Sequence, residues 1–534
     1  MPVMRVSRRE ALLAGGALGL MGLAGCSASG GAQGRGTLVI GFSPEPPTLT
    51  SAATTAGPTQ SISTKIFDGL VTFDAGGNPL PQLALSWETA ADALSVTFKL
   101  RPNVKWHDGQ PFTSSDVAYS LLDVWKKLHG RGRSTFATVE AVDTPDPLTA
   151  IFRLSRPVPY LVTALSSAES QIVPRHVYAG RDFLSNPAGN APIGTGPFRF
   201  AEWRRGEFIR LERNADYWNR DEPRLDGIIY RLFSDPAAAG AALETGEVQL
   251  LTSTQVSLSD VRRLKREPQL RVTERPSGFT AALSVFEFNL DRPHLGDARV
   301  RQAFAHAIDK KFLLENAWQG FGTVEDSPIP RLMAQFHDPA VPRYAFDPGA
   351  ARALLDAAGL KPDSRGLRLR LTHDPAPTGD ALQKSAFAIR DNLRKVGVDL
   401  VIRSSDFAGF IKRVYTDRDF DTSQYSASAG PDPAIGTQRF YWSKNFQPGV
   451  AFSNGAHYVN PQVDALLEQA QREVDPARRK ALYAAFQQQV QRDLPRIPLV
   501  ASTAAILAST RVHGLPDTAY GALDNFAGVS LAPA

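Results

Sequence analysis

Few residues of this sequence have the types and spacing that chemistry requires. The nine histidines are scattered without metal-ligand spacing, and a single cysteine, Cys26, allows neither a disulfide nor a cysteine-based metal site. No GxxxxGK phosphate loop, HExxH zinc motif or GxSxG nucleophile motif occurs. His107-Asp108 could be an acid–base pair and residues 194–197 (GTGP) a phosphate loop, but the first falls in a turn and the second precedes a strand pattern. We interpret both as structural turns and expect no metal, no cofactor and no enzyme activity.

The N-terminus has the pattern of an export signal. An arginine-rich start is followed by 15 uncharged residues, 11–25, which are too few to span a bilayer but suit a signal peptide. Residues 7–13 (SRREALL) resemble a twin-arginine signal, with the general export route as the alternative. Residues 23–26 (LAGC) resemble a lipobox that would make Cys26 the lipidated first residue; the alternative is a plain secretory signal. Residues 26–36 are small and polar, which predicts a flexible tether.

Composition indicates an ordinary globular protein with more than one core. The chain has 534 residues, of which 43% are hydrophobic, whereas single cores stop growing near 250–300 residues or so. The formal net charge is +5, and removal of residues 1–25, with three arginines and one glutamate, leaves +3. No cluster of lysine and arginine interleaved with aromatic residues occurs, so nucleic-acid binding has no support. We expect a monomer.

The first half of the mature chain is expected to be rich in strands. Residues 37–41 predict a buried strand, and residues 94–100 alternate apolar and polar side chains as a half-buried strand does. Residues 113–116 (TSSD) have the pattern of a capping box and predict a helix that runs to about residue 128.

The second half is expected to alternate strands and helices. Apolar residues at every fourth position across 300–312 predict one helical face, and residues 475–493 predict a late helix. Residues 367–371, 379–396 and 398–402 predict a strand, a helix and a strand, so the two strands should be parallel with a right-handed crossover. The fold class is therefore α/β.

Several blocks of sequence then resemble one known family. Residues 101–121 (RPNVKWHDGQPFTSSDVAYSL), 192–218 (PIGTGPFRFAEWRRGEFIRLERNADYW) and 300–330 resemble successive signatures of the solute-binding proteins of dipeptide, oligopeptide and nickel ABC importers. Later blocks, including DLPRIPLV, follow in the family's order, and the resemblance extends from about residue 37 to 530.

The resemblance implies a two-lobed periplasmic-binding-protein-like fold. Two hinge strands near residues 284–289 and 495–500 would join the lobes, and an extra α+β domain would be inserted in the first lobe. The implied divisions are lobe I at 37–65, 193–284 and 497–534, the inserted domain at 66–192, and lobe II at 285–496.

It also implies a function. The protein would capture a peptide or peptide-like small solute in the periplasm or cell envelope by hinge closure. It would be held to the membrane by a lipid anchor and would deliver the solute to permease subunits and their ATPase. Two alternatives remain: a secreted hydrolase with a carboxylate pair in the cleft, and a ligand-sensing partner of a membrane receptor.

In this family, loops that face the cleft contact the ligand. The candidates come from the loop after the first strand, the residues past the first hinge, and a small-residue loop that leads to an aromatic cluster: Ser43, Glu45, Phe288, Asn289, Tyr425, Ser426, Gly430, Asp432, Arg439, Tyr441 and Trp442.

One departure bears on the ligand. Peptide-binding members have an aspartate, a few residues before an Asp-Pro, that pairs with the ligand's free amine, but residues 426–431 hold no carboxylate. A buried, unpaired ammonium is costly. We therefore predict a modified peptide, an opine-like or sugar-like compound, or a metal chelate. Arg439 would pair an anionic group on it, and Tyr441 and Trp442 would form an apolar wall.

Overall fold

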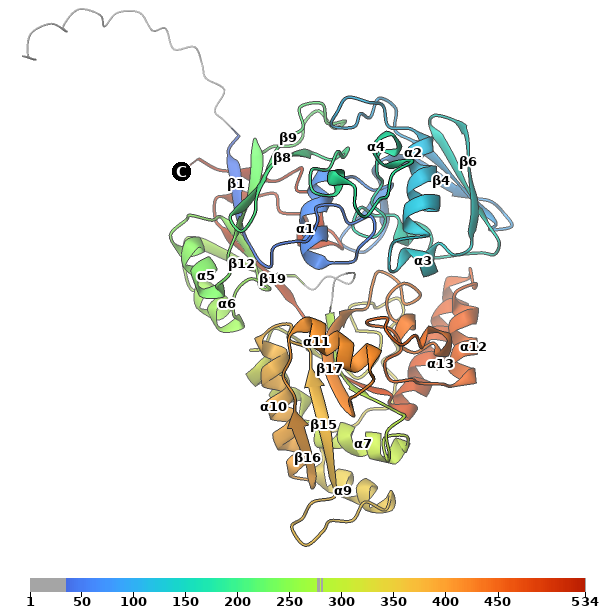
Figure 1. Cartoon of the computed structure of the whole chain (residues 1–534), viewed down its shortest axis with the longest axis vertical. Helices are drawn as coiled ribbons and strands as arrows, with labels where there is room; N and C mark the ends of the chain where they lie inside the picture. Colours follow the sequence, from blue (N-terminus) through green and yellow to red (C-terminus); the bar gives the residue numbers. More distant parts are fainter. Residues whose placement is uncertain (1–34, 276–278, 280–281, 534) are drawn as a thin grey trace, which may run out of the picture. The chain divides into compact units, whose positions relative to one another are not determined.

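The first large sheet is assembled from strands far apart in the sequence (Figure 1). The computed structural model describes residues 35–275, 279 and 282–533. In this sheet β1 is parallel to both of its neighbours, β10 and β11, and all other neighbouring strands are antiparallel. In spatial order the strands are β12 (Leu270–Arg275), β19 (Ala504–Ser509), β11 (Leu250–Thr252), β1 (Thr37–Phe42), β10 (Gly227–Leu232), β9 (Phe208–Arg213) and β8 (Phe198–Arg204).

The second large sheet contains the predicted strand–helix–strand unit. The strand β15, the helix α10 (Asp380–Arg394) and the strand β16 follow one another, and β15 and β16 are parallel, which confirms the prediction. The side chains of Leu382, Ala386, Ile389 and Leu393 form the buried face of α10. In spatial order the strands are β14 (Gly322–Val324), β18 (Arg496–Ser502), β13 (Ala282–Phe288), β17 (Thr422–Ser428), β15 (Leu369–Pro375) and β16 (Val398–Ile402).

Two connections carry the chain between these sheets. β12 of the first sheet precedes β13 of the second, and β18 of the second is followed, after Thr503, by β19 of the first. The segments expected to be hinges, residues 284–289 and 495–500, largely coincide with β13 and β18. Because β13 and β18 pair with each other, ladder hydrogen bonds hold both segments in the second sheet.

A smaller antiparallel sheet lies in the region predicted as the inserted domain. Its order is β4 (Ala84–Thr89), β5 (Ser95–Leu100), β7 (Thr149–Leu154) and β6 (Val139–Asp146). The predicted capping box is present at Thr113 and Asp116, and it begins α2 (Ser114–Tyr119), which continues as a π-helical segment to Trp125. Two further pairs of strands are β2 (Val71–Phe73) with β3 (Pro79–Pro81), and β20 (Val512–His513) with β21 (Ser530–Leu531).

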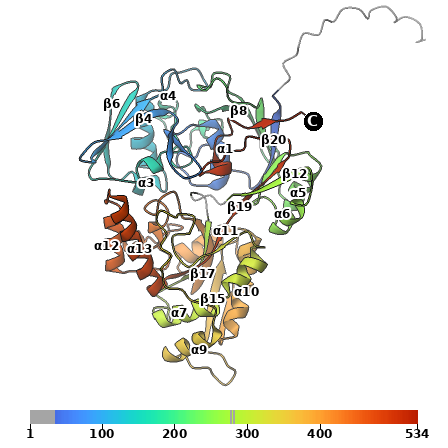
Figure 2. The ribbon, with the colours of Figure 1, turned by 180° about the vertical axis from the view of Figure 1, so that it is seen from behind.

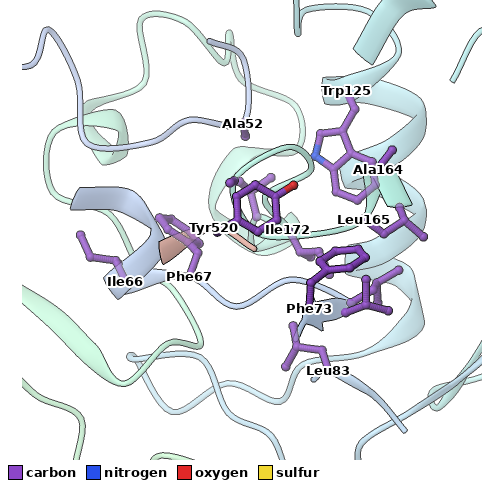
Figure 3. Packing of buried hydrophobic residues seen from close by; sticks show 14 of the residues in the cluster. Ala52, Ile66, Phe67, Phe73, Leu83, Trp125, Ala164, Leu165, Ile172 and Tyr520 are labelled. Carbon is purple, nitrogen blue, oxygen red and sulfur yellow. The ribbon is translucent and has the colours of Figure 1, made fainter. Parts of the chain in front are cut away.

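Helices pack on these sheets, and apolar cores lie between the layers. α5 and α6 lie beside β12 and β19 in both views (Figures 1 and 2). A large core joins the first sheet to the small one; Figure 3 shows Ile66, Phe73, Trp125 and Tyr520 within it. The remaining helices are α1 (Gly57–Ile66), α3 (Gly132–Thr135), α4 (Arg175–Tyr178), α5 (Pro236–Glu244), α6 (Leu258–Leu264), α7 (Ala298–Ala307), α8 (Lys310–Phe312), α9 (Pro348–Ala357), α11 (Phe407–Ile411), α12 (Pro461–Ala470) and α13 (Pro476–Asp493).

The single helical face expected across residues 300–312 is wrong in its second half. α7 ends at Ala307, and the Asp309 side chain accepts a hydrogen bond from the Phe312 amide and so caps a new helix, α8. Phe312 is 45% exposed instead of buried. Local capping by aspartate therefore prevails over the four-residue apolar spacing.

His107-Asp108 lies in a turn as predicted, and residues 194–197 form a bent segment that leads into β8. The Gly194 amide donates to Nδ1 of His107 at 3.1 Å, and Nε2 of His107 lies 3.0 Å from the Gly196 carbonyl oxygen. Burial lowers the pKa of His107 to about 4. A Cβ atom at Gly194 would overlap the carbonyl oxygen of Ile66, so the glycine permits close backbone approach to α1.

Candidate functional site

A mostly apolar cavity lies at one end of the first sheet. It has a volume of about 620 Å³ and opens at the carboxyl ends of β1 and β11, which run parallel. α1, the beginning of β19 and residues 517–526 complete its wall. Ligands of α/β proteins commonly bind outside the carboxyl ends of parallel strands, because chain connections diverge there and leave a crevice. We call this space the β1 cavity.

The β1 cavity has the chemistry of a small-molecule site. Its walls are mostly apolar, and a few side chains contribute hydroxyl and amide groups to them, as is usual for a pocket of this size. The apolar wall includes Phe42, Pro44, Tyr230, Leu250, Ile506 and Phe526, and the polar groups include Ser43, Ser61, Thr252 and Gln255. The Tyr520 ring, labelled in Figure 3, lines the cavity and also packs against the core through Phe73.

One buried cation belongs to this wall. Lys65, in the last turn of α1, is 1% exposed, and its Nζ donates to the Ala522 carbonyl oxygen at 2.8 Å. The ammonium also lies 4.2 Å from the centre of the Phe526 ring. Burial lowers the pKa of Lys65 to about 7, and the negative charge of Asp524 opposes that shift.

Of the residues predicted in the loop after β1, one lies at the cavity. Ser43 lines the β1 cavity directly after the strand. Glu45 turns toward the hairpin of β8 and β9 instead, where its Oε1 accepts hydrogen bonds from Nε1 of Trp203 at 2.9 Å and from the Gly206 amide at 3.3 Å. Its carboxylate is thus engaged on the protein surface.

Phe288 and Asn289 lie inside the core that covers the second sheet. The Phe288 side chain is fully buried and its ring packs edge-to-face against Phe304. Asn289 is 1% exposed, and its Nδ2 donates to the Phe420 carbonyl oxygen at 3.0 Å. In this conformation both side chains support the end of β13 and do not face a cavity.

Tyr425 and Tyr441 surround a buried arginine on the second sheet. The Arg496 guanidinium lies 4.9 Å from the Tyr425 ring and 5.5 Å from the Tyr441 ring, and its Nε is 3.1 Å from Oε1 of Glu287. The Tyr425 hydroxyl donates to the same carboxylate at 3.0 Å. Burial raises the pKa of Glu287 and lowers that of Arg496, and the ion pair opposes both shifts. A void of about 20 Å³ adjoins this cluster.

The small-residue loop is tied to α13 by an ion pair. Asp432 is 3% exposed and accepts two hydrogen bonds from Arg479, at 2.6 and 2.7 Å. Gly430 has φ +72°, and a Cβ there would lie 2.9 Å from Cα of Gly436, so the turn requires glycine. Ser426, at the start of the loop, is half-buried.

Arg439 and Trp442 follow this loop on a short 3-10 segment and its end. Nε of Arg439 donates to the Gly436 carbonyl oxygen at 3.1 Å. Burial, and the positive charge of Arg131, lower the pKa of Arg439 to about 10. Nε1 of Trp442 donates to Oε1 of Glu468 at 3.0 Å, so the indole is oriented toward α12.

The structure thus places Ser43 at the β1 cavity and most other predicted residues near the second sheet. Sequence reasoning missed Lys65 and residues 517–526. A signal was available for Lys65, because it is the only charged residue of the sequence GPTQSISTKI and lies between apolar positions 62 and 66. The C-terminal segment has no comparable signal.

The described residues contain neither a candidate metal-ion cluster nor a candidate membrane-spanning helix. In the part of the chain that the structure describes, no three or more His, Cys, Asp or Glu side chains gather where a metal ion could be held. None of the helices described here has the length and hydropathy to cross a membrane. Cys26 and the export signal lie outside the described residues.

Comparisons with known proteins agree with the fold. A family model described as bacterial extracellular solute-binding proteins, family 5, matches residues 78–448. A Brucella ovis protein named "Putative ABC transporter peptide-binding protein" is 32% identical over 480 residues, which are 85% of each chain.

Solved structures extend the match to nearly the whole chain. The ABC transporter-associated periplasmic binding protein DppA from Helicobacter pylori, in complex with the peptide STSA, superposes with a TM-score of 0.78 at 25% identity and covers 93% of this chain and 98% of its own. AgaA from A. tumefaciens R10, in complex with agropinic acid, gives a TM-score of 0.79 at 25% identity, with 93% and 99% covered.

The expected two-lobed α/β fold and the expected function, a solute-binding protein of an ABC importer that acts in the periplasm, are confirmed. Its family consists of binding proteins and not of enzymes. This chain belongs to family 5 of the bacterial extracellular solute-binding proteins.

Proposed function

We propose that this protein binds a peptide-like or other small solute at the β1 cavity and is held at the membrane by a lipid on Cys26. The observation that carries the proposal is the cavity of about 620 Å³ at the carboxyl ends of β1 and β11. Its volume is that of a typical small-molecule site, and its polar groups are few and separated, as recognition of one defined solute requires.

Closure of lobe II over lobe I would complete the site. Contacts between lobe II and the rest of the chain are both polar and apolar. Oγ of Ser428 donates to the Phe279 carbonyl oxygen at 3.1 Å, Nη1 of Arg262 donates to Oε1 of Gln319 at 3.1 Å, and Ile435 packs in the large core of the first sheet. A solute that touches both lobes would add its own contacts to these and shift the population toward the closed form.

The ligand class follows from the loop of residues 426–432. It has no carboxylate before Asp432, and Asp432 is occupied by Arg479. A free amine therefore has no carboxylate partner on that loop. A modified peptide, or a compound of the kind that AgaA binds, suits the site better than an ordinary free peptide.

A cavity-filling substitution tests the site. Ser61 lies on α1 at the cavity wall, so Ser61→Trp should occupy the space and abolish solute binding. The matched control, Ser259→Trp, adds the same side chain at an exposed position of α6. Native mass spectrometry of freshly purified protein should show a small-molecule adduct on the wild type and the control but not on Ser61→Trp. An adduct of equal abundance on all three would refute the site.

The anchor has its own test. Cys26→Ser removes the only thiol that a lipid could modify, so the protein should move from the membrane fraction to the soluble fraction after export. Fractionation of wild-type protein as soluble, with an unmodified Cys26, would contradict the lipid anchor and leave solute binding untouched.

A further inference from the structure

Lys65 is a buried cation that forms an ion pair with no carboxylate in the part of the chain that the structure describes. It is 1% exposed, and no aspartate or glutamate among the described side chains forms an ion pair with it. Its Nζ contacts are the Ala522 carbonyl oxygen at 2.8 Å, the Thr64 hydroxyl at 3.2 Å and the face of the Phe526 ring. A buried charge without a partner of opposite sign is unfavourable unless something else supplies that partner.

The position of Lys65 indicates what could supply this partner. Lys65, Ala522 and Phe526 all line the β1 cavity, so the ammonium lies among residues of the cavity wall. The nearby acidic groups are Asp517, which lines the same cavity, Asp524, which attracts the ammonium from a distance, and Asp68, beyond the end of α1. Asp68 is directed to other groups, since its oxygens accept from Gln82 and Trp218 at 2.8 and 2.9 Å.

We infer that the β1 cavity takes a solute with an apolar body and one anionic group, most simply a carboxylate, which pairs with Lys65. The apolar body would lie against walls such as Phe42, Tyr230 and Leu250. This inference rests on the proposed function and specifies its ligand. It differs from the pairing expected with Arg439, which lies on the second sheet's side and is not part of the cavity wall.

Anion binding at Lys65 would be accompanied by proton uptake. The pKa of Lys65 is about 7 in the free protein, so a large fraction of the side chains is neutral at pH 8. A bound carboxylate favours the charged form and raises this pKa, so binding at pH 8 must take up a proton. The affinity for an acid should therefore fall as pH rises above about 7, by up to about tenfold per pH unit.

A matched pair of probes tests the inference. N-acetyl-leucyl-leucine carries one carboxylate and no amine, and its C-terminal amide has the same apolar body without the charge. Isothermal titration calorimetry at pH 7 should show that the acid binds wild-type protein about tenfold or more tightly than the amide. At pH 8, titration of the acid in buffers of different ionisation enthalpy should show proton uptake.

Variants then locate the charge. Lys65→Met keeps an apolar side chain of similar length, so it should weaken binding of the acid about tenfold or more, remove proton uptake and leave binding of the amide unchanged. Lys311→Met removes a lysine that lies outside the cavity and whose side chain is 83% exposed. It should change neither the affinity for the two probes nor the proton uptake. Thermal melting in the absence of probe confirms that each variant is folded.

The outcomes separate this inference from the proposed function. Equal affinity of wild-type protein for acid and amide would overturn the pairing and leave solute binding standing. Retention of tight acid binding by Lys65→Met would place the anion elsewhere, for example at Arg439, and would also overturn it. If neither probe binds but a co-purified solute does, an apolar acid is the wrong class. If nothing binds and no adduct is found, the proposed function fails as well.

Discussion

Several buried cations near the second sheet form ion pairs with carboxylates, whereas Lys65 at the β1 cavity does not. Near the second sheet, Arg479 binds both oxygens of Asp432, Arg496 lies 3.1 Å from Glu287, and Lys310 lies 2.9 Å from Asp326. Arg301, also buried, donates to carbonyl oxygens that include that of Asp493 at the end of α13. At the β1 cavity, Lys65 has a single carbonyl, a hydroxyl and an aromatic ring.

The difference separates structural charges from a charge available to a ligand. A buried ion pair with satisfied hydrogen bonds joins two elements and has little capacity left for a third group. A buried ammonium at a cavity wall without a carboxylate partner lowers the stability of the free protein but is prepared for an anion. The comparison therefore predicts opposite effects on stability when the two kinds of cation are replaced.

The largest expected effect is at the loop of residues 426–432. Arg479→Met leaves Asp432 buried without its partner, so the free energy of unfolding should fall by about 3–5 kcal/mol. Urea denaturation of the apo protein measures the change. Arg478→Met, next in the sequence with a side chain that is 76% exposed, should change it by less than about 0.5 kcal/mol. Similar losses of unfolding free energy in both variants would show that the buried ion pair contributes no more to stability than an exposed arginine.

Replacement of Lys65 should raise the free energy of unfolding, whereas replacement of Arg479 should lower it. Below pH 7 the ammonium is charged in both the folded and unfolded states, so the cost of burying it is fully present. Between pH 7 and the unfolded value of 10.5, the folded state binds fewer protons, so wild-type stability rises with pH. Lys65→Met should therefore be more stable than wild type by up to about 5 kcal/mol at pH 6, with the gain much reduced at pH 10.

Denaturation curves at the two pH values check this sign. A variant less stable than wild type at pH 6, or a difference that does not change with pH, would show that Lys65 is satisfied by the protein itself. Lys65 would then belong with the paired cations of the second sheet.

A bound solute should stabilise the protein and bring the lobes together. At a hundredfold excess over the dissociation constant, the free energy of unfolding should rise by about 2.7 kcal/mol. Small-angle scattering should show a smaller radius of gyration for the saturated wild type. Ser61→Trp, with its cavity filled, should show neither change. Stabilisation without compaction would contradict hinge closure but not binding.

The smallest effect is expected at the exposed pair of Asp108 and His176. Oδ2 of Asp108 lies 2.7 Å from Nε2 of His176, and both side chains are partly exposed. Asp108→Asn should lower the free energy of unfolding by less than about 1 kcal/mol and leave solute affinity unchanged. Loss of solute binding in this variant would show that the turn at residues 107–109 has a role that the structure does not assign to it.

Local patterns in the sequence predicted much of the fold. The capping box at Thr113 and the parallel unit of β15, α10 and β16 depend on residues close together in the chain, and both are present. The helix across residues 300–312 was predicted from apolar spacing alone, and the competing cap at Asp309 was overlooked.

The site was less predictable because its contacts are distant in sequence. Lys65 and its carbonyl partner Ala522 are separated by 457 positions, so no local pattern relates them. Asp432 and Arg479 are 47 positions apart, and the acid therefore looked available for a ligand. Ser43 is predicted because the loop after the first strand faces the ligand in the family that the sequence resembles, and in the structure this residue lines the β1 cavity.

A crystal structure of wild-type protein with its co-purified solute tests the central claim most directly. We expect density for the solute in the β1 cavity, between Phe42, Tyr230 and Leu250, with an anionic group within hydrogen-bonding distance of Nζ of Lys65. Density for the solute outside this cavity, with Lys65 still bound only to Ala522 and its neighbours, would contradict it.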